Sequence, residues 1–171
     1  MTEQQSIQAW FAGRLPDGWF IRPAEVSSDN DEILVVGPLA PPDIPTDADD
    51  AAKEHAHVGR IKRFREDTRE KRMQIADEAE RQFNRKVAWG ASSGDVKRLF
   101  TTMSVPVMTR LRLPERQVLD TLVESGVARS RSDALAWCVR LVGKHEADWM
   151  QDLRDALVHV QKVRAEGPTT I

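Results

Sequence analysis

Two arginines separated by one residue, Arg110 and Arg112, lie in the alternating run MTRLRL at positions 108–113. Successive side chains of a strand point to opposite faces, so Met108 and both arginines would share one face and the two leucines the other. A guanidinium fork matches the O6 and N7 acceptors of guanine, and a two-stranded antiparallel ribbon fits the major groove of DNA. The run therefore predicts a strand that needs a partner strand and that presents base-reading arginines.

A second group of polar residues, Arg129 to Ser132, lies just before a predicted helix. Ser130 and Asp133 match a capping box, in which Ser130 accepts from a free helix N–H and Asp133 reaches back to the N–H of Ser130. The free N–H groups and positive dipole end of a helix also suit a phosphate. Arg129, Ser130, Arg131 and Ser132 are therefore candidate phosphate ligands, with a simple helix cap as the alternative.

Two predicted helices would hold these groups in place. Pro114 stops the strand and favours the first turn of a helix over residues 114–125, and Gly126 suits the position just beyond it. Apolar side chains recur at helical spacing along this first helix, at Val118, Leu119, Leu122 and Val123. The second helix starts after Ser130 and has its own apolar side, formed by Leu135, Val139 and Val142. Each helix therefore has one face for a small core.

A strand, a Pro-initiated helix, a short loop and an SRSD-capped helix together resemble the ribbon-helix-helix family of DNA-binding proteins, the Arc and MetJ repressor type. The resemblance covers residues 107–143, about a fifth of the chain. It implies an obligate two-fold dimer in which one strand from each subunit forms a ribbon in the major groove of double-stranded DNA. It further implies that Met108, Arg110 and Arg112 face the bases and that Arg129 to Ser132 hold the backbone. The expected function is a transcriptional regulator.

Two other interpretations stay open. Alternating Arg and Leu strands also occur as solvated edges of ordinary sheets, where the arginines bind nothing specific. Alternatively, the ribbon only dimerises the chain, and the acidic N-terminal part grips a protein partner, as in an antitoxin. Antitoxins of this family generally bind the toxin through a flexible tail after the ribbon module. A regular helix is predicted there instead, and this disfavours the antitoxin interpretation.

The charge of the chain is unevenly distributed. The 171 residues have a net charge of −2, but residues 1–56 carry 3 basic and 11 acidic side chains and the remainder carries 22 and 16. A basic part beside an acidic one is compatible with nucleic-acid binding. The sequence has no apolar run of about twenty residues and no secretory signal pattern, so we expect no membrane partner and a cytoplasmic, nucleoid-associated location.

The predicted fold class is α+β, with two domains over residues 1–102 and 103–171. The first domain should contain a helix, two hairpins and a long charged helix, and it could bind a protein or a small molecule or simply brace the dimer. Its predicted parts are a helix over Ser6–Leu15, strands at Trp19–Val26 and Glu32–Leu39, an acidic Pro-rich linker over 38–50, the long helix over about 47–86, and strands at Val87–Ala91 and Val96–Thr101. The second domain should end in an amphipathic helix, with Trp149, Leu153, Ala156, Leu157, Val160 and Val163 along one stripe.

The long helix contains a dense basic segment. Residues 60–72 hold seven basic and three acidic side chains. They could contact DNA phosphates next to the ribbon. The alternative is a solvated face with i,i+4 ion pairs, such as Asp67 with Lys71.

No arrangement of residues indicates an enzyme. His55 and His57 lack the four-residue spacing that puts two metal ligands on one helical face. Cys138 is the only cysteine, so neither an internal disulfide nor a thiolate zinc cluster can form. The glycines form no phosphate-binding loop. We therefore expect no catalytic residue, no cofactor and no metal site.

Overall fold

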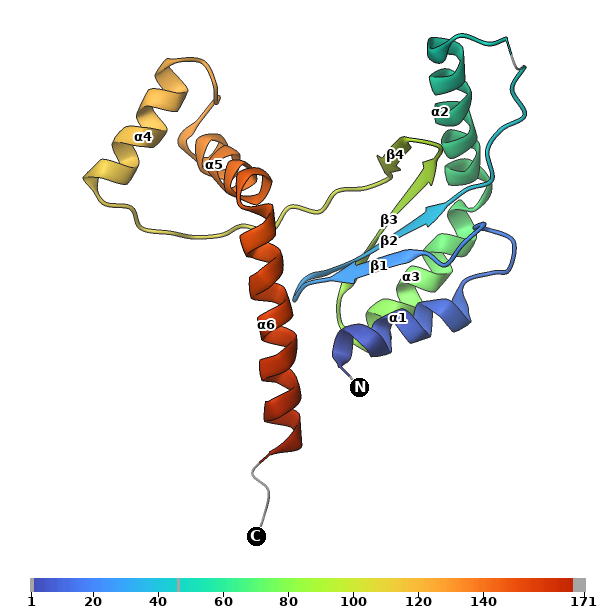
Figure 1. The fold of residues 1–171 in the computed structure, drawn as a ribbon, viewed down its shortest axis with the longest axis horizontal. Coiled ribbons are helices and arrows are strands. Elements are labelled where there is room, and N and C mark those ends of the chain that lie inside the picture. The colour runs from blue at the N-terminus through green and yellow to red at the C-terminus, as the bar shows by residue number, and fades with distance from the viewer. Residues whose placement is uncertain (1, 46, 168–171) are drawn as a thin grey trace. The chain divides into compact units, whose positions relative to one another are not determined.

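A four-stranded sheet organises the first half of the computed structural model, which describes residues 2–45 and 47–167 (Figure 1). The chain forms two compact units that divide after Pro106. The first unit contains, in order, α1 (Glu3–Arg14), β1 (Glu25–Ser28), β2 (Glu32–Pro38), α2 (Asp50–Asp67), α3 (Arg69–Phe83), β3 (Lys86–Ser93) and β4 (Val96–Leu99). The second contains α4 (Leu113–Glu124), α5 (Arg131–His145) and α6 (Ala147–Glu166). The predicted α+β class is confirmed.

The sheet has the strand order β1-β2-β3-β4. Strands β1 and β2 are antiparallel, as are β3 and β4, so both predicted hairpins are confirmed. The two hairpins are joined through a parallel β2–β3 pair in which Val35 lies opposite Trp89. A parallel pair needs a long crossover connection, and here α2 and α3 provide it. The sequence did not predict this joining.

Helices α1, α2 and α3 contact the sheet and supply about half of the buried apolar core of the first unit. Strand β2 is buried over most of its length, as its continuous apolar run predicts. Aromatic rings meet edge to face in this core, with Trp19 5.5 Å from Phe64 and Phe11 6.2 Å from Trp89 between ring centroids. The buried helix residues are Ile7, Phe11, Ile61, Phe64, Ile75 and Ala79.

The single long helix predicted over 47–86 is wrong. The structure has two helices that break at Thr68, and regular helix runs only from Asp50 to Phe83. The Thr68 hydroxyl donates to the carbonyl oxygen of Phe64 at 2.6 Å. A threonine that bonds back to the preceding turn competes with the helical ladder and bends the helix. The break therefore follows from a local side-chain bond.

The strand predicted at 108–113 is also wrong for the isolated chain. Residues 101–112 belong to no sheet or helix, and Leu113 is already the first residue of α4. An extended segment becomes a ladder only when another backbone pairs with it. Within the described part of this chain, no segment pairs with 101–112.

Helix α6 confirms the predicted terminal helix but packs little. It has no buried residue, and its apolar stripe is exposed from Trp149 to Val163. The positions Trp149, Leu153, Ala156, Val160 and Val163 follow each other at steps of four and three. This is the spacing of a helix seam that packs against another helix. No helix over 2–45 and 47–167 is long and apolar enough to cross a membrane.

One backbone position in the first unit has no room for a side chain. A Cβ on Gly37, in β2, would lie 2.1 Å from the ring of Phe20. By contrast, a Cβ on Gly59, in α2, would have no atom outside its own helix within 4 Å. The two glycines therefore make a matched pair for testing the packing of the sheet.

We predict that Gly37→Ala destabilises the first unit by about 1–3 kcal/mol, because the added methyl must displace Phe20 from the core. Gly59→Ala should instead stabilise it by about 0.5–1 kcal/mol, because alanine is the better helix former. Urea unfolding followed by tryptophan fluorescence measures both changes. Equal stability of the two variants would contradict the close contact between Gly37 and Phe20.

Candidate nucleic-acid interface

The segment with the predicted base-reading residues is extended and open to solvent. Met108 is 94% exposed, and Arg110 and Arg112 are exposed as well. Leu111 is half-buried against the small core of the second unit. The main chain of this segment is held at Leu111, whose carbonyl oxygen accepts from Nη1 of Arg116 at 2.7 Å. The alternation of exposed arginines with a core-facing leucine is therefore present before any strand pairing.

Helix α4 starts directly after the last candidate base reader. Arg112 is its cap residue, with an extended backbone at φ −82° and ψ 175°, and Pro114 lies in the first turn. Among the described residues, neither Arg110 nor Arg112 forms an ion pair or a side-chain hydrogen bond. Both guanidinium groups therefore keep all their donors for a ligand.

The N-terminus of α5 is capped as predicted, with one correction. Ser130 accepts a hydrogen bond from the N–H of Asp133 at 3.2 Å. The Asp133 carboxylate, however, accepts from the N–H of Arg129 at 3.0 Å, one residue before the predicted donor. This bond lowers the pKa of Asp133 below its ordinary value. The side chain of Arg129 remains 95% exposed, 3.7 Å from Asp133 at its nearest nitrogen.

Arg131 has a partner that the sequence did not reveal. Its Nε and Nη2 donate to the two carboxylate oxygens of Asp120, on α4, at 2.6 and 2.7 Å. This fork-to-fork pair raises the pKa of Arg131 and lowers that of Asp120. The pair joins α4 to α5. The two residues are eleven positions apart on different helices, so no periodic signal could have identified Asp120.

The four candidate phosphate ligands at the N-terminus of α5 therefore differ in whether their side chains are available to bind a phosphate. Ser130 is committed to the cap and Arg131 to Asp120. Arg129 and Ser132 are exposed beside the first turn of the helix. A phosphate at this end would meet the Arg129 side chain and the first free N–H groups of α5.

The basic segment on α2 and α3 does not form the predicted intrahelical ion pairs. Over residues 2–45 and 47–167, none of its seven lysines and arginines lies within 4 Å of a carboxylate oxygen, as the nine ion pairs all involve other cations. The predicted pair of Asp67 with Lys71 is among those missing. Both side chains are exposed, where the small gain of an ion pair does not fix two flexible groups together.

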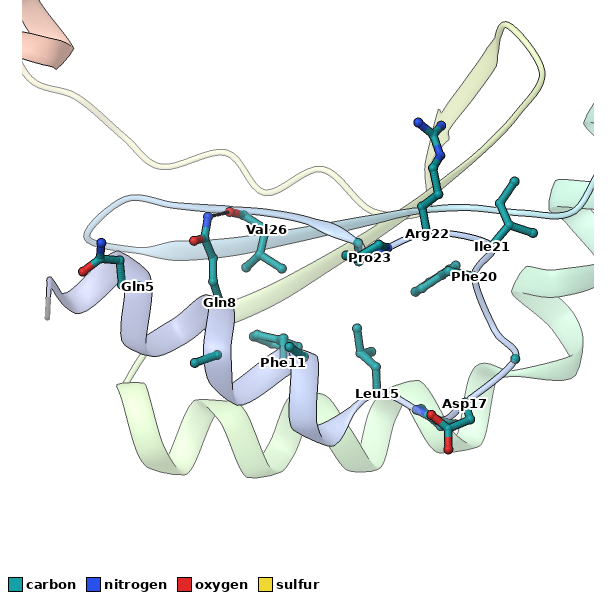
Figure 2. Close-up of a pocket in the computed structure, with 15 residues that line it drawn as sticks. Gln5, Gln8, Phe11, Leu15, Asp17, Phe20, Ile21, Arg22, Pro23 and Val26 are labelled. Atoms are coloured by element: carbon teal, nitrogen blue, oxygen red, sulfur yellow. Dashed lines mark hydrogen bonds between the residues drawn. The ribbon is translucent and has the colours of Figure 1, made fainter.

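The first unit also has a hollow that could hold a small molecule (Figure 2). It has a volume of about 760 Å³ and lies between α1 and the segment that leads into β1. Phe11, Leu15 and Phe20 face it, while Arg22 points away from α1. The amide of Gln8 already donates to the carbonyl oxygen of Val26 at 3.3 Å. The hollow is mostly apolar, and its lining specifies no ligand class.

Two histidines that the sequence set aside are also engaged in local bonds. His55 bonds through Nδ1 to the carbonyl oxygen of Ala51 at 2.7 Å, and His57 bonds through Nδ1 to the hydroxyl of Ser93 at 2.9 Å. In the part of the chain that the structure describes, no three His, Cys, Asp or Glu side chains gather as a metal ion requires.

Comparison with known proteins gives two family matches that together span most of the chain. The model of the Rv1265-like protein N-terminal domain matches residues 5–99, and that of the Mb1296 C-terminal domain matches residues 112–164. Uncharacterized protein Mb1296 of Mycobacterium bovis and uncharacterized protein Rv1265 of Mycobacterium tuberculosis are each 53% identical to the chain over 159 residues. The match covers 93% of this chain and 69% of each relative. No solved structure matches the chain.

The pair of Arg131 with Asp120 gives the second unit a pH-dependent contribution. Since the pKa of Asp120 is lowered in the folded state, the contribution is present above the unfolded pKa, near 4, and is lost as the pH falls through the folded pKa. We predict that Asp120→Asn is less stable than the wild type at pH 7 and that the difference vanishes in acid, once the pH lies below the folded-state pKa of Asp120.

Thermal unfolding at fixed protein concentration measures this difference. Asp152→Asn is the control, because Asp152 is an exposed residue of α6 without an ion pair among the described residues. A pH-independent loss in Asp120→Asn, or an equal loss in the control, would show that the carboxylate does not act through Arg131.

Proposed function

From the premise that the chain belongs to the family of Rv1265-like proteins, we propose that it is a dimeric DNA-binding regulator. Residues 107–143 of two copies form the reading module, with Arg110 and Arg112 directed at base edges in the major groove. Such a protein works in the cytoplasm, on the nucleoid. The proposal rests on the residues of this chain, because the printed names of its relatives state no function.

The main support for a dimer is the incomplete core of the second unit. Only Leu119, Ala128 and Ala134 are buried among its described residues. Many large apolar side chains remain exposed instead, including Leu113, Val118, Val127, Val139, Leu141, Val142, Leu153 and Leu157. Helices of this length owe their stability in water to the burial of an apolar face. An exposed apolar surface of this extent marks an interface with another chain.

A second copy of the same unit supplies what is missing. The extended residues 107–112 have backbone donors and acceptors without a ladder, and the same segment of a two-fold related copy can pair with them. Pairing would keep Leu111 toward the core, where it already lies, and would leave Arg110 and Arg112 on the outer face. Two strands would then present four arginines to the groove.

Backbone contacts would come from the first turn of α5. Arg129 is free to move toward a phosphate, and the N–H groups next to Ser132 provide the dipole end. Arg131 serves this site by positioning α5 against α4 through Asp120. In this assignment Arg131 is a positioning residue, and Arg129 and Ser132 are the contacting ones.

A substitution in the exposed apolar surface of the second unit tests the proposed dimer. Val139, on α5, is 66% exposed, and Val158, on α6 outside the stepped stripe, is 59% exposed. Val139→Asp should convert the dimer to monomer at micromolar concentration, because a carboxylate would be buried in the apolar interface without a partner. Val158→Asp should leave the dimer intact. Sedimentation or light scattering after size exclusion gives the masses, and a wild-type monomer would contradict the proposal.

The second prediction tests base reading. A duplex site is first selected from a random pool with the wild-type protein. Arg110→Ala with Arg112→Ala should then reduce the preference for this site over random duplex about tenfold or more at fixed salt, since each good arginine contact to guanine discriminates by ~1–3 kcal/mol. The affinity for random duplex should change much less.

Arg22→Ala is the matched control, because Arg22 is an exposed arginine of the first unit without an ion pair in the described ranges. Fluorescence anisotropy at two salt concentrations provides the measurement. If the double variant kept its full preference for the selected site, Arg110 and Arg112 would not read bases.

A further inference from the structure

Arg72 is a buried cation without a carboxylate partner. It is only 7% exposed, and it lies on α3 one turn after the break at Thr68. Its Nε donates to the Thr68 hydroxyl at 3.0 Å, and its Nη2 donates to the carbonyl oxygen of Arg65 at 2.6 Å. No acidic group lies within ion-pair distance of it among the described residues. Burying a charge without an opposite charge is costly, so this guanidinium leaves an uncompensated positive potential.

Two more arginines gather around Arg72. Burial, together with the nearby positive charges of Arg65 and Arg69, lowers the pKa of Arg72 to about 10. The guanidinium carbon of Arg72 lies 4.8 Å from the centroid of the Phe100 ring, and that of Arg65 lies 5.8 Å from the same centroid. The charges of Arg65 and Arg72 therefore both lie near the Phe100 ring. The nearby acids Glu66, Asp67 and Glu70 do not pair with any of them.

One nitrogen of Arg72 faces outward. Nη1 has no hydrogen-bond partner among the described residues, and no fully buried side-chain nitrogen there lacks a partner. Nη1 therefore reaches the surface. The side chains of Arg65 and Arg69 are exposed, so they can move to contact a ligand that binds to Arg72.

We propose that Arg65, Arg69 and Arg72 form a binding site for a phosphate group. Guanidinium forks match phosphate oxygens in pairs, and three positive charges suit a multiply charged oxyanion better than a single carboxylate. The phosphate can come from the backbone of DNA or from a free phosphorylated compound. Only the DNA case rests on the function proposed above. The Phe100 ring attracts the guanidiniums of Arg65 and Arg72, which lie within 5.8 Å of its centroid.

The first test uses inorganic phosphate and the 171-residue chain without DNA. We compare wild type, Arg65→Gln with Arg69→Gln, and Arg63→Gln, an exposed arginine of α2 outside the three-arginine cluster. Replacing chloride by phosphate at constant ionic strength should raise the Tm of the wild type and of Arg63→Gln by about 3–6 °C more than that of the double variant. The general stabilisation that phosphate gives to any protein cancels in this comparison.

Both substituted arginines of the double variant are exposed, so its fold should be retained, and circular dichroism without phosphate checks this. An equal Tm rise in all three proteins overturns the phosphate site. This result is independent of DNA binding, so it separates failure of the site from failure of the proposed function.

The second test identifies the source of the phosphate. For a DNA backbone ligand, the double variant should reduce the slope of log affinity against log salt by ~0.9 for each lost phosphate contact. A full wild-type slope, together with loss of the phosphate-induced Tm rise, assigns the site to a free phosphorylated compound. The variant with Arg110 and Arg112 replaced should keep the phosphate-induced Tm rise in either case.

Discussion

Apolar surface that one chain cannot bury is the constraint on which the function proposed for this protein depends. In the second unit, a small core with only three buried residues among those described holds α4 and α5 together, while α6 and the outer sides of α4 and α5 remain open to water. The preceding segment is extended, and its backbone pairs with nothing in the described part of its own chain. A second copy in two-fold contact would supply both a strand partner for the extended backbone and a cover for the exposed apolar side chains. Arg110 and Arg112 are already exposed on either side of the core-facing Leu111 in the single chain, and the proposed pairing would add the two arginines of the second copy beside them.

The first unit has the opposite character, because its core is complete without a partner. Strands β2 and β3 lie in the middle of the sheet, and three helices supply buried side chains to it. A rigid frame of this kind can hold a buried cation that a small core could not. Arg72 is fixed by the Thr68 hydroxyl, by the carbonyl oxygen of Arg65 and by the Phe100 ring, and each of these belongs to the frame. Both hydrogen-bond acceptors of Arg72, the carbonyl oxygen of Arg65 and the Thr68 hydroxyl, therefore lie at the break between α2 and α3.

Local patterns in the sequence predicted most helices and strands, but they did not predict contacts between residues far apart in the chain. Helical periodicity and turn residues sufficed for α1, β2, the second hairpin, α4, α5 and α6 to within a few residues, whereas the strand predicted at 19–26 is found at Glu25–Ser28. The parallel joining of β2 to β3 connects segments about fifty residues apart, and no local pattern encodes it. The break at Thr68 depends on one hydroxyl that bonds back to Phe64, which composition does not reveal. The strand at 108–113 was misjudged because alternation describes which side chains share a face, whereas a strand also needs a backbone partner.

The arginines of this protein fall into two groups. Those paired with a carboxylate hold parts of the fold together, and those without such a partner are available to bind a ligand. Arg14 binds Glu78 and thereby ties α1 to α3, and Arg131 binds Asp120 and ties α4 to α5. In each pair both groups stay charged, but the opposite charges offset each other's field, so little of it remains for a ligand. Arg65, Arg72, Arg110 and Arg112 have no such partner within the described ranges. Sequence alone assigned Arg131 and Arg110 to the same DNA surface, because residue type does not say whether the charge is already neutralised. The structure divides them, and it directs the search for phosphate and base contacts to the arginines that the fold leaves uncompensated.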